Sequence, residues 1–240
     1  MRKFFVDKLT DRVVLTGADH KHLSVVCRAK KGENIVLCDG YYDGDYEITD
    51  IKKDATYLLL KKKTKNESET TVNLDLYFCA LKSDKNDFIV QKCTELGVKN
   101  FFPVISDFVQ SGAKNVNVER LGRIAEEAAK QCGRGAVPTV AAPMDFSAML
   151  ERLKKYSLVV FPYESEKNTD IKSFLSGAEN ARDIAALIGC EGGFSKGEVE
   201  QLKDAGITPI TLGNRILRAE TACITTTSVI LYEKGEMKSI

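Results

Sequence analysis

The chain has 240 residues, of which 43% are hydrophobic, and its formal net charge at pH 7 is +1. This composition is typical of a globular protein with a sizeable core, and the near-zero charge argues against a protein that holds nucleic acid by bulk positive charge. No apolar run is long enough for a transmembrane helix and the first residues lack the apolar segment of a signal peptide, so we expect a cytoplasmic protein without membrane contact.

The cysteines and histidines give no sign of a metal centre. The seven cysteines are odd in number and none are spaced C-x-x-C, so we expect reduced thiols rather than disulfides or a zinc site. His20 and His22 lie two residues apart and could share one face of a strand. Because no carboxylate or cysteine cluster completes that pair, we expect no metal.

The first part of the chain reads as a small β-rich domain. Short runs of β-favouring residues are separated by glycine and by Asp-Gly pairs, and one short helix is expected near residues 19–26. Closely spaced short strands in about 60 residues favour a small barrel. The expected strands cover residues 3–6, 12–15, 34–38, 46–49 and 56–60.

A polar stretch separates this domain from the rest of the chain. Residues 61–71 are charged and have no apolar periodicity, so we interpret them as the end of the last barrel strand and a linker. The expected domains are therefore residues 1–68 and 72–240. Within the first, Arg28, Lys30 and Lys31 form a basic cluster that is either a solvated loop or a phosphate contact.

From Val72 onward, strand patterns alternate with helical patterns, which favours a mainly parallel sheet with helices on both faces. Asp145 is a plausible N-cap for one of these helices. The expected strands cover residues 72–81, 101–105 and 157–161, and the expected helices lie near residues 88–96, 121–128, 146–153 and 170–175.

Two further strands each end in a glycine-bearing loop. The run 183–188 is followed by Gly189, Gly192 and Gly193, and the capping-box spacing of Ser195 and Glu198 predicts that a helix begins at Lys196. The run 208–212 is followed by Gly213 and Asn214, and a helix is expected from about residue 218 to 232. Ligands of open α/β sheets bind at the carboxyl ends of strands, and glycine lets the backbone approach them closely.

Common nucleotide and hydrolase motifs are missing from these loops. The sequence has no G-x-x-x-x-G-K-[ST], no G-x-G-x-x-G and no G-x-S-x-G. The residues alone therefore predict an α/β ligand-binding enzyme with a β-rich N-terminal module.

The two loops together resemble the paired signature of the 16S ribosomal RNA (uracil-N3)-methyltransferase family. The first half reads Ile188-Gly189-x-Glu191-Gly192-Gly193-Phe194-Ser195, and the second reads Leu212-Gly213-x-Arg215-Ile216-Leu217-Arg218-x-Glu220-Thr221-Ala222. Both halves occur in order and at about the family's spacing, and the resemblance covers nearly the whole chain. Cys190 stands where the family usually has proline, which we expect to loosen the turn slightly.

The resemblance implies a fold that periodicity could not reveal. The family belongs to the SPOUT class, so we expect an α/β domain with a trefoil knot over residues 72–240, preceded by a PUA-like, RNA-binding β-barrel over residues 1–68. It also implies S-adenosylmethionine as the methyl donor, 16S ribosomal RNA or the assembled small ribosomal subunit as the substrate, and a homodimer.

The resemblance places the methyl donor in the two loops and at the end of the strand 157–161. The donor-binding residues that it implies are Phe161, Tyr163, Glu164, Leu187, Ile188, Gly189, Glu191, Gly192, Gly193, Leu212, Gly213, Asn214, Ile216, Leu217, Arg218 and Ala222.

The residues expected to take part in catalysis and in RNA binding are charged. Arg218 is expected to hold the uracil anion or the target phosphate, since its planar fork of donors suits either role. Glu220 and Glu191 are both candidates for the general base, and Glu220 could instead be a first-turn carboxylate that stabilises its helix. Arg28, Lys30, Lys31 and Arg134 are expected to contact RNA, although Arg134 could also be a cation at a helix C-terminus.

Two other functions remain open at this point. The chain could be a non-catalytic dimeric RNA-binding protein, but intact glycines and Arg218 favour an enzyme. It could also be a SPOUT methyltransferase that acts on another RNA position, which the N-terminal barrel and the run from Arg215 to Arg218 disfavour.

Overall fold

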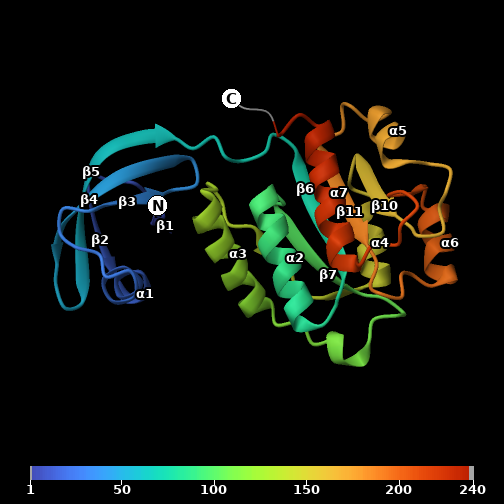
Figure 1. Cartoon of the computed structure of the whole chain (residues 1–240), viewed down its shortest axis with the longest axis horizontal. Coiled ribbons are helices and arrows are strands. Elements are labelled where there is room, and N and C mark those ends of the chain that lie inside the picture. Colours follow the sequence, from blue (N-terminus) through green and yellow to red (C-terminus); the bar gives the residue numbers. More distant parts are fainter. Residues whose placement is uncertain (1, 238–240) are drawn as a thin grey trace. The chain divides into compact units, whose positions relative to one another are not determined.

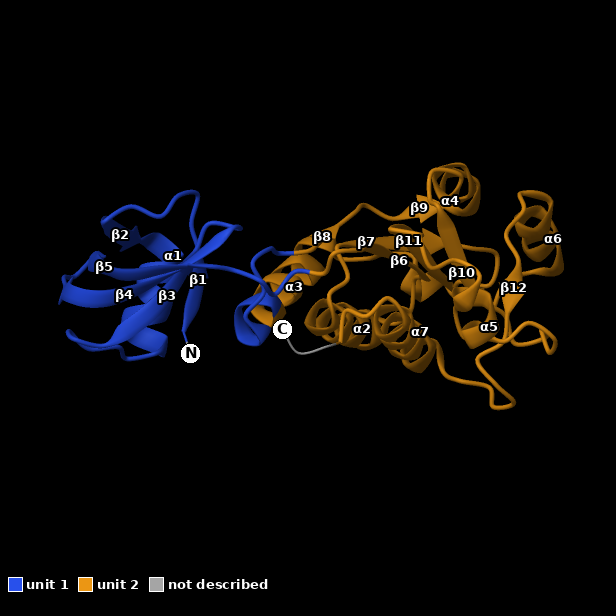
Figure 2. Ribbon diagram, turned by 90° about the horizontal axis from the view of Figure 1, so that it is seen from above, with its two compact units in different colours: residues 1–69, 129–137 blue, residues 70–128, 138–240 orange. Residues whose placement is uncertain are grey.

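The computed structural model describes residues 2–237, which fold into two compact units. Unit 1 contains the chain up to Glu69 and residues 129–137, whereas unit 2 contains residues 70–128 and the chain from Pro138 onward (Figure 2). The sequence predicts a single passage from one domain to the next. The return of residues 129–137 to unit 1 departs from that expectation.

Unit 1 is built on a curled five-stranded sheet with the order β1-β3-β4-β5-β2. β1 pairs with β3 in parallel, and the other neighbours are antiparallel. A short helix, α1 (Gly17–Lys21), continues into one π-helical turn, His22–Val26, where the sequence predicts a helix. The strands are β1 (Lys3–Phe5), β2 (Arg12–Thr16), β3 (Asn34–Cys38), β4 (Tyr42–Ile51) and β5 (Ala55–Lys65).

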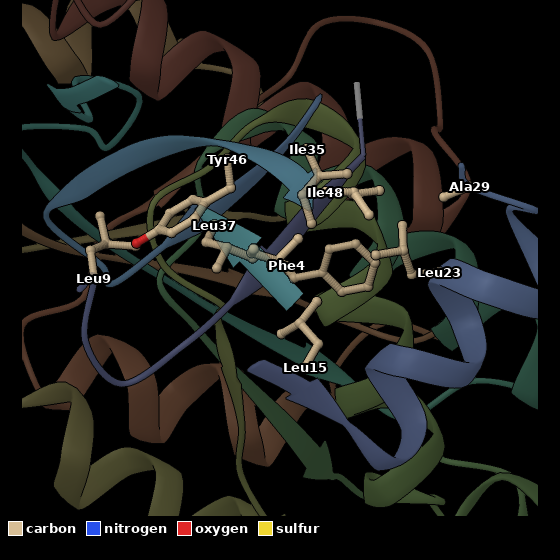
Figure 3. Close-up of a cluster of buried hydrophobic side chains, with 10 residues drawn as sticks. Phe4, Leu9, Leu15, Leu23, Ala29, Ile35, Leu37, Tyr46 and Ile48 are labelled. Atoms are coloured by element: carbon tan, nitrogen blue, oxygen red, sulfur yellow. The ribbon is translucent and has the colours of Figure 1, made fainter. Parts of the chain in front are cut away.

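The core of unit 1 lies on the inner side of this sheet. Alternate residues of β4 are buried, as expected for a strand with one covered face. Figure 3 shows Phe4, Leu23, Ile35 and Ile48 gathered into one cluster with the other buried side chains. Tyr46 reaches the edge of that cluster, where its hydroxyl donates to the carbonyl of Thr10 at 2.6 Å, so its polar end is satisfied.

His20 is buried in unit 1, and protein groups contact both of its ring nitrogens. Its imidazole is buried, with Nδ1 at 2.8 Å from the hydroxyl of Thr56 and Nε2 at 3.1 Å from the carbonyl of Lys53. Both ring nitrogens are therefore engaged within unit 1. Across residues 2–237, no group of three or more His, Cys, Asp or Glu side chains could hold a metal ion.

Unit 2 is built on a seven-stranded sheet with the order β12-β10-β11-β6-β7-β8, in which β9 also pairs with β7. Every pairing in it is parallel. This arrangement confirms the α/β class that the alternating pattern predicts. The strands are β6 (Asn73–Cys79), β7 (Asn100–Ile105), β8 (Thr139–Val140), β9 (Met144–Asp145), β10 (Leu158–Pro162), β11 (Asp183–Ile188) and β12 (Pro209–Ile210).

Helices cover both faces of this sheet, with α2, α7 and α5 on one face and α4 on the other (Figures 1 and 2). A single 3₁₀ turn, Ser111–Ala113, follows β7. Across residues 2–237, no helix is both long enough and apolar enough to cross a membrane. The helices are α2 (Ser83–Leu96), α3 (Val118–Cys132), α4 (Phe146–Leu153), α5 (Ile171–Ser176), α6 (Lys196–Asp204) and α7 (Ala219–Glu233).

The helix ends follow from local sequence signals. Asp145 accepts a hydrogen bond from the backbone N–H of Ala148, which confirms it as the N-cap of α4. Ser195 and Glu198 form the predicted reciprocal capping box, so α6 begins at Lys196. Gly97 ends α2 in the left-handed conformation, with φ of 118°, which favours glycine.

Candidate active site

The carboxyl ends of β10, β11 and β12 meet at one edge of the parallel sheet of unit 2. The loops that follow these strands enclose a cavity of about 680 Å³. Such a volume is in the range of small-molecule sites, and the position is the one where open α/β sheets bind ligands.

Nearly all of the expected donor-binding residues line this cavity. Phe161 and Leu187 do not, because both are completely buried in their strands. The ring of Phe161 instead packs edge-on against Phe194, 5.6 Å between centroids, and so supports the wall from behind. The expected residues that line the cavity are Tyr163, Glu164, Ile188, Gly189, Glu191, Gly192, Gly193, Leu212, Gly213, Asn214, Ile216, Leu217, Arg218 and Ala222.

The lining also contains residues outside the expected donor-binding set. Six of them are chain neighbours of expected residues, so continuity along the loops is the signal that could have found them, whereas Glu166 and Lys167 lie further along the loop after β10. The additional lining residues are Pro162, Glu166, Lys167, Cys190, Phe194, Thr211, Arg215 and Ala219.

Glycines keep the floor of the cavity free of side chains. Gly193 has φ of +69°, and a Cβ there would lie 3.1 Å from Oε1 of Glu164. A Cβ on Gly189 would lie 3.0 Å from the Cα of Gly193. Both positions therefore require glycine, and the resulting cradle of bare backbone suits a nucleoside-like ligand such as S-adenosylmethionine.

Cys190 lies in the turn of the first loop. The N–H of Gly193 donates to the carbonyl of Cys190 at 2.9 Å, and the thiol donates to the carbonyl of Gly193 at 3.5 Å. Burial raises the pKa of the Cys190 thiol, so it stays protonated and acts as a donor. The turn thus has its own hydrogen bonds where the family usually has proline.

The two candidate bases lie on either side of a lysine that the sequence does not single out. Nζ of Lys85, in the first turn of α2, is 2.6 Å from Oε1 of Glu191 and 3.8 Å from Oε2 of Glu220. Glu191 lines the cavity, whereas Glu220 does not and follows the lining residues Arg218 and Ala219 in the first turn of α7. The structure therefore joins three charged groups from three segments at one side of the cavity.

Arg218 stands at the entrance to α7. It is the N-cap residue of that helix, its side chain is exposed, and it lines the cavity. Among residues 2–237, no carboxylate forms an ion pair with its guanidinium. A free guanidinium at a helix N-terminus is suited to an anionic ligand or a developing negative charge.

The basic cluster expected to contact RNA is exposed in unit 1. Arg28, Lys30 and Lys31 all have exposed side chains. Arg28 has φ of +48°, and it is the one non-glycine residue with positive φ among residues 2–237. Backbone strain of this kind concentrates at functional sites, which supports a binding role for Arg28.

Arg134 has a different environment. Its side chain is buried, and its Nε and Nη2 donate to the carboxylate of Glu69 at 3.1 and 2.7 Å. Glu69 also accepts from the backbone N–H groups of Gly135 and Ala136. The pair therefore attaches residues 129–137 to unit 1, and a phosphate contact by Arg134 would first have to break it.

This pair predicts a stability effect rather than an RNA-binding effect. Arg134→Met should destabilise the fold by about 3 kcal/mol, because it leaves the half-buried carboxylate of Glu69 without its cation. Burial alone would raise the pKa of Glu69, but Arg134 and the backbone N–H groups of Gly135 and Ala136 together lower that pKa. The pair's contribution is thus present at neutral pH and lost as the pH falls below about 4.5.

Denaturant unfolding at pH 7 and pH 4 measures this effect. Arg28→Met is the control, because it removes an exposed guanidinium and should leave stability almost unchanged. Equal destabilisation by both variants would contradict the structural role of Arg134.

Comparison with known proteins agrees with this geometry. Residues 68–231 match the RNA methyltransferase domain family. The chain is 30% identical to ribosomal RNA small subunit methyltransferase E of Bacillus subtilis, with 97% of each chain covered. It is 31% identical to the Rickettsia conorii protein of the same name, over 89% of this chain and 87% of the other.

Solved structures share the fold as well. The structure of ribosomal RNA small subunit methyltransferase E from Neisseria gonorrhoeae bound to S-adenosyl methionine is 28% identical, with a TM-score of 0.84 over 97% of each chain. A putative methyltransferase from Legionella pneumophila, in complex with the same cofactor, is 25% identical, with a TM-score of 0.84 over 96% of each chain. With its curled N-terminal sheet, its parallel α/β sheet and its glycine-lined cavity, the chain belongs to the ribosomal RNA small subunit methyltransferase E family, of the SPOUT class.

Proposed function

We propose that this protein transfers a methyl group from S-adenosylmethionine to N3 of one uridine in 16S ribosomal RNA, and that it acts on the assembled small subunit in the cytoplasm. The observation that carries the proposal is the glycine-floored cavity at the ends of β10, β11 and β12. A relative with the same fold holds S-adenosyl methionine.

Methylation at N3 requires that the target uracil is not base-paired. N3 of uracil carries a proton and faces the Watson–Crick partner, so the target must be unpaired and accessible. The donor's sulfonium supplies an already activated methyl group. The protein therefore has to position the two reactants, which can account for much of the rate gain, and to accept the N3 proton.

Different residues carry out these steps. The loops after β10, β11 and β12 hold the donor against bare backbone. Arg218, at the cavity and without an ion-pair partner among residues 2–237, stabilises the uracil anion or the neighbouring phosphate. Glu220 or Glu191 receives the proton. Arg28, Lys30 and Lys31 in unit 1 contact the phosphates of the RNA.

We also propose a homodimer that uses α7. The helix carries Ala, Cys, Ile, Thr and Val on most of its faces, which suits burial on more than one side. Light scattering at micromolar concentration should give twice the 26.6 kDa mass of the chain. A mass of one chain under those conditions would contradict the dimer.

The test of the proposed function is mass spectrometry of 16S ribosomal RNA from cells with and without this protein. Loss of a single N3-methyluridine in the deletion strain, restored by the wild-type chain, is the expected result. Loss of a methyl group elsewhere would indicate a methyltransferase with another target. Unchanged RNA, together with no binding of S-adenosylmethionine by calorimetry, would indicate a non-catalytic RNA-binding protein.

A further inference from the structure

Three charged side chains meet beside the donor cavity although they are far apart in the sequence. Lys85 comes from the first turn of α2, Glu191 from the loop after β11, and Glu220 from the first turn of α7. Lys85 and Glu191 are 106 residues apart in the chain and 2.6 Å apart in space.

We propose that Lys85 is a positioning residue for methyl transfer, which holds Glu191 in an ion pair and leaves Glu220 as the group that accepts the N3 proton of the target uridine. This inference rests on the proposed function, and it chooses between the two bases that the sequence leaves open.

The contacts of the two carboxylates are unequal. Glu191 receives a direct hydrogen bond from Nζ of Lys85. Oε2 of Glu220 lies 3.8 Å from the same nitrogen, too far for a hydrogen bond. That oxygen is buried and has no hydrogen-bond partner among residues 2–237. A buried carboxylate oxygen without a donor is costly, so Oε2 of Glu220 is suited to accept a hydrogen bond from an arriving donor.

The charges around the two carboxylates support the same assignment of Glu191 to the ion pair and Glu220 to proton acceptance. The hydrogen bond to Glu191 raises the pKa of Lys85, against opposing effects of burial and of Arg218. Burial alone would raise the pKa of Glu191, but the hydrogen bond and charge of Lys85, a backbone hydrogen bond and the charge of Lys82 together lower that pKa. Lys85 therefore stays protonated and Glu191 stays ionised at neutral pH, which makes Glu191 a poor proton acceptor.

The reaction step balances with these groups. Because Glu220 does not line the cavity, the N3 proton reaches its carboxylate through one water molecule. The N3 lone pair forms the bond to the methyl carbon. The electrons of the carbon–sulfur bond remain on sulfur, so the sulfonium charge is lost. Glu220 then releases the proton to solvent, and Lys85 remains protonated throughout.

The decisive variant is Lys85→Met. It should lower kcat about tenfold to a hundredfold, because it removes the cation that pairs with Glu191 and screens the repulsion between Glu191 and Glu220. Removing a cation raises the pKa of neighbouring carboxylates, so the acidic limb of the kcat–pH profile should move to higher pH. The affinity for S-adenosylmethionine, measured by calorimetry, should stay within about twofold, and Lys85→Arg should restore part of kcat.

Lys92→Met is the matched control. Lys92 lies in the same helix and forms an ion pair with Glu95 at 2.8 Å, but it does not line the cavity. This variant should leave kcat, its pH profile and donor affinity unchanged. A Lys85→Met protein with the kcat and pH profile of wild type would overturn the inference, as would one that loses donor affinity and keeps its turnover.

A second measurement does not depend on turnover. Carbon-13 NMR titration of the glutamate carboxyls should show a depressed pKa for Glu191 in the wild type and a higher one in Lys85→Met. An equal pKa in both would refute the ion pair. If the wild type makes no N3-methyluridine, the proposed function fails and the catalytic part of the inference fails with it, while the titration still decides the arrangement of the charges.

Discussion

Arg218→Ala should lower turnover about a hundredfold to a thousandfold while S-adenosylmethionine still binds, because a donor aimed at developing negative charge has an effect of about that size. The guanidinium is exposed at the cavity, and no carboxylate pairs with it among residues 2–237. Its loss should therefore have little effect on the stability of the fold. Single-turnover methylation and calorimetry with the donor measure the two quantities separately.

Arg182→Ala is the control for this variant. Arg182 is also exposed in unit 2 but does not line the cavity, so its loss should leave turnover unchanged. If Arg218→Ala kept its turnover and bound the donor weakly, Arg218 would be a donor-binding residue and the stabiliser of the anion would lie elsewhere.

Gly193→Val should abolish detectable donor binding in a protein that still folds. A Cβ at this position would lie 3.1 Å from Oε1 of Glu164, and the two further methyl groups of valine would enter the cavity. The backbone φ of +69° adds strain, since branched side chains rarely adopt it. Calorimetry with S-adenosylmethionine and a thermal unfolding scan report on the binding and on the fold.

A variant of a second glycine separates the effect of backbone strain from the effect of lost space in the cavity. Gly206 has φ of +81°, with no atom within 4 Å of its Cβ position, and it does not line the cavity. Gly206→Val should therefore have a lower unfolding temperature, because of the backbone strain, and a normal affinity for the donor. Unchanged affinity in a folded Gly193→Val protein would remove Gly193 from the donor site.

The elements with clear local signals could be predicted from the sequence. The run 183–188 matches β11 at both ends, because an apolar run is bounded there by a charged residue and a glycine. The start of α6 follows from the spacing of Ser195 and Glu198, which is a purely local hydrogen-bonding pattern. The position of the cavity could be predicted for the same reason, since each loop that lines it begins directly after such a strand.

Features that depend on distant contacts could not be predicted. Lys85 lies within an ordinary charged helix start, and its role appears only when the loop of Glu191 lies beside it. Arg134 sits in a glycine-flanked loop that resembles a binding segment, and only the fold brings Glu69 to it. β8 and β9 have two residues each, which is too short for any periodicity to show.

Methylation in a purified system tests the central claim most directly. The full-length chain is mixed with small ribosomal subunits that lack the modification and with S-adenosylmethionine labelled in its methyl group, and the RNA is then digested to nucleosides and analysed by mass spectrometry. We predict about one labelled N3-methyluridine per subunit with the wild type and none with Gly193→Val. Label in any other nucleoside, or no label with a wild-type protein that binds the donor, would contradict this account.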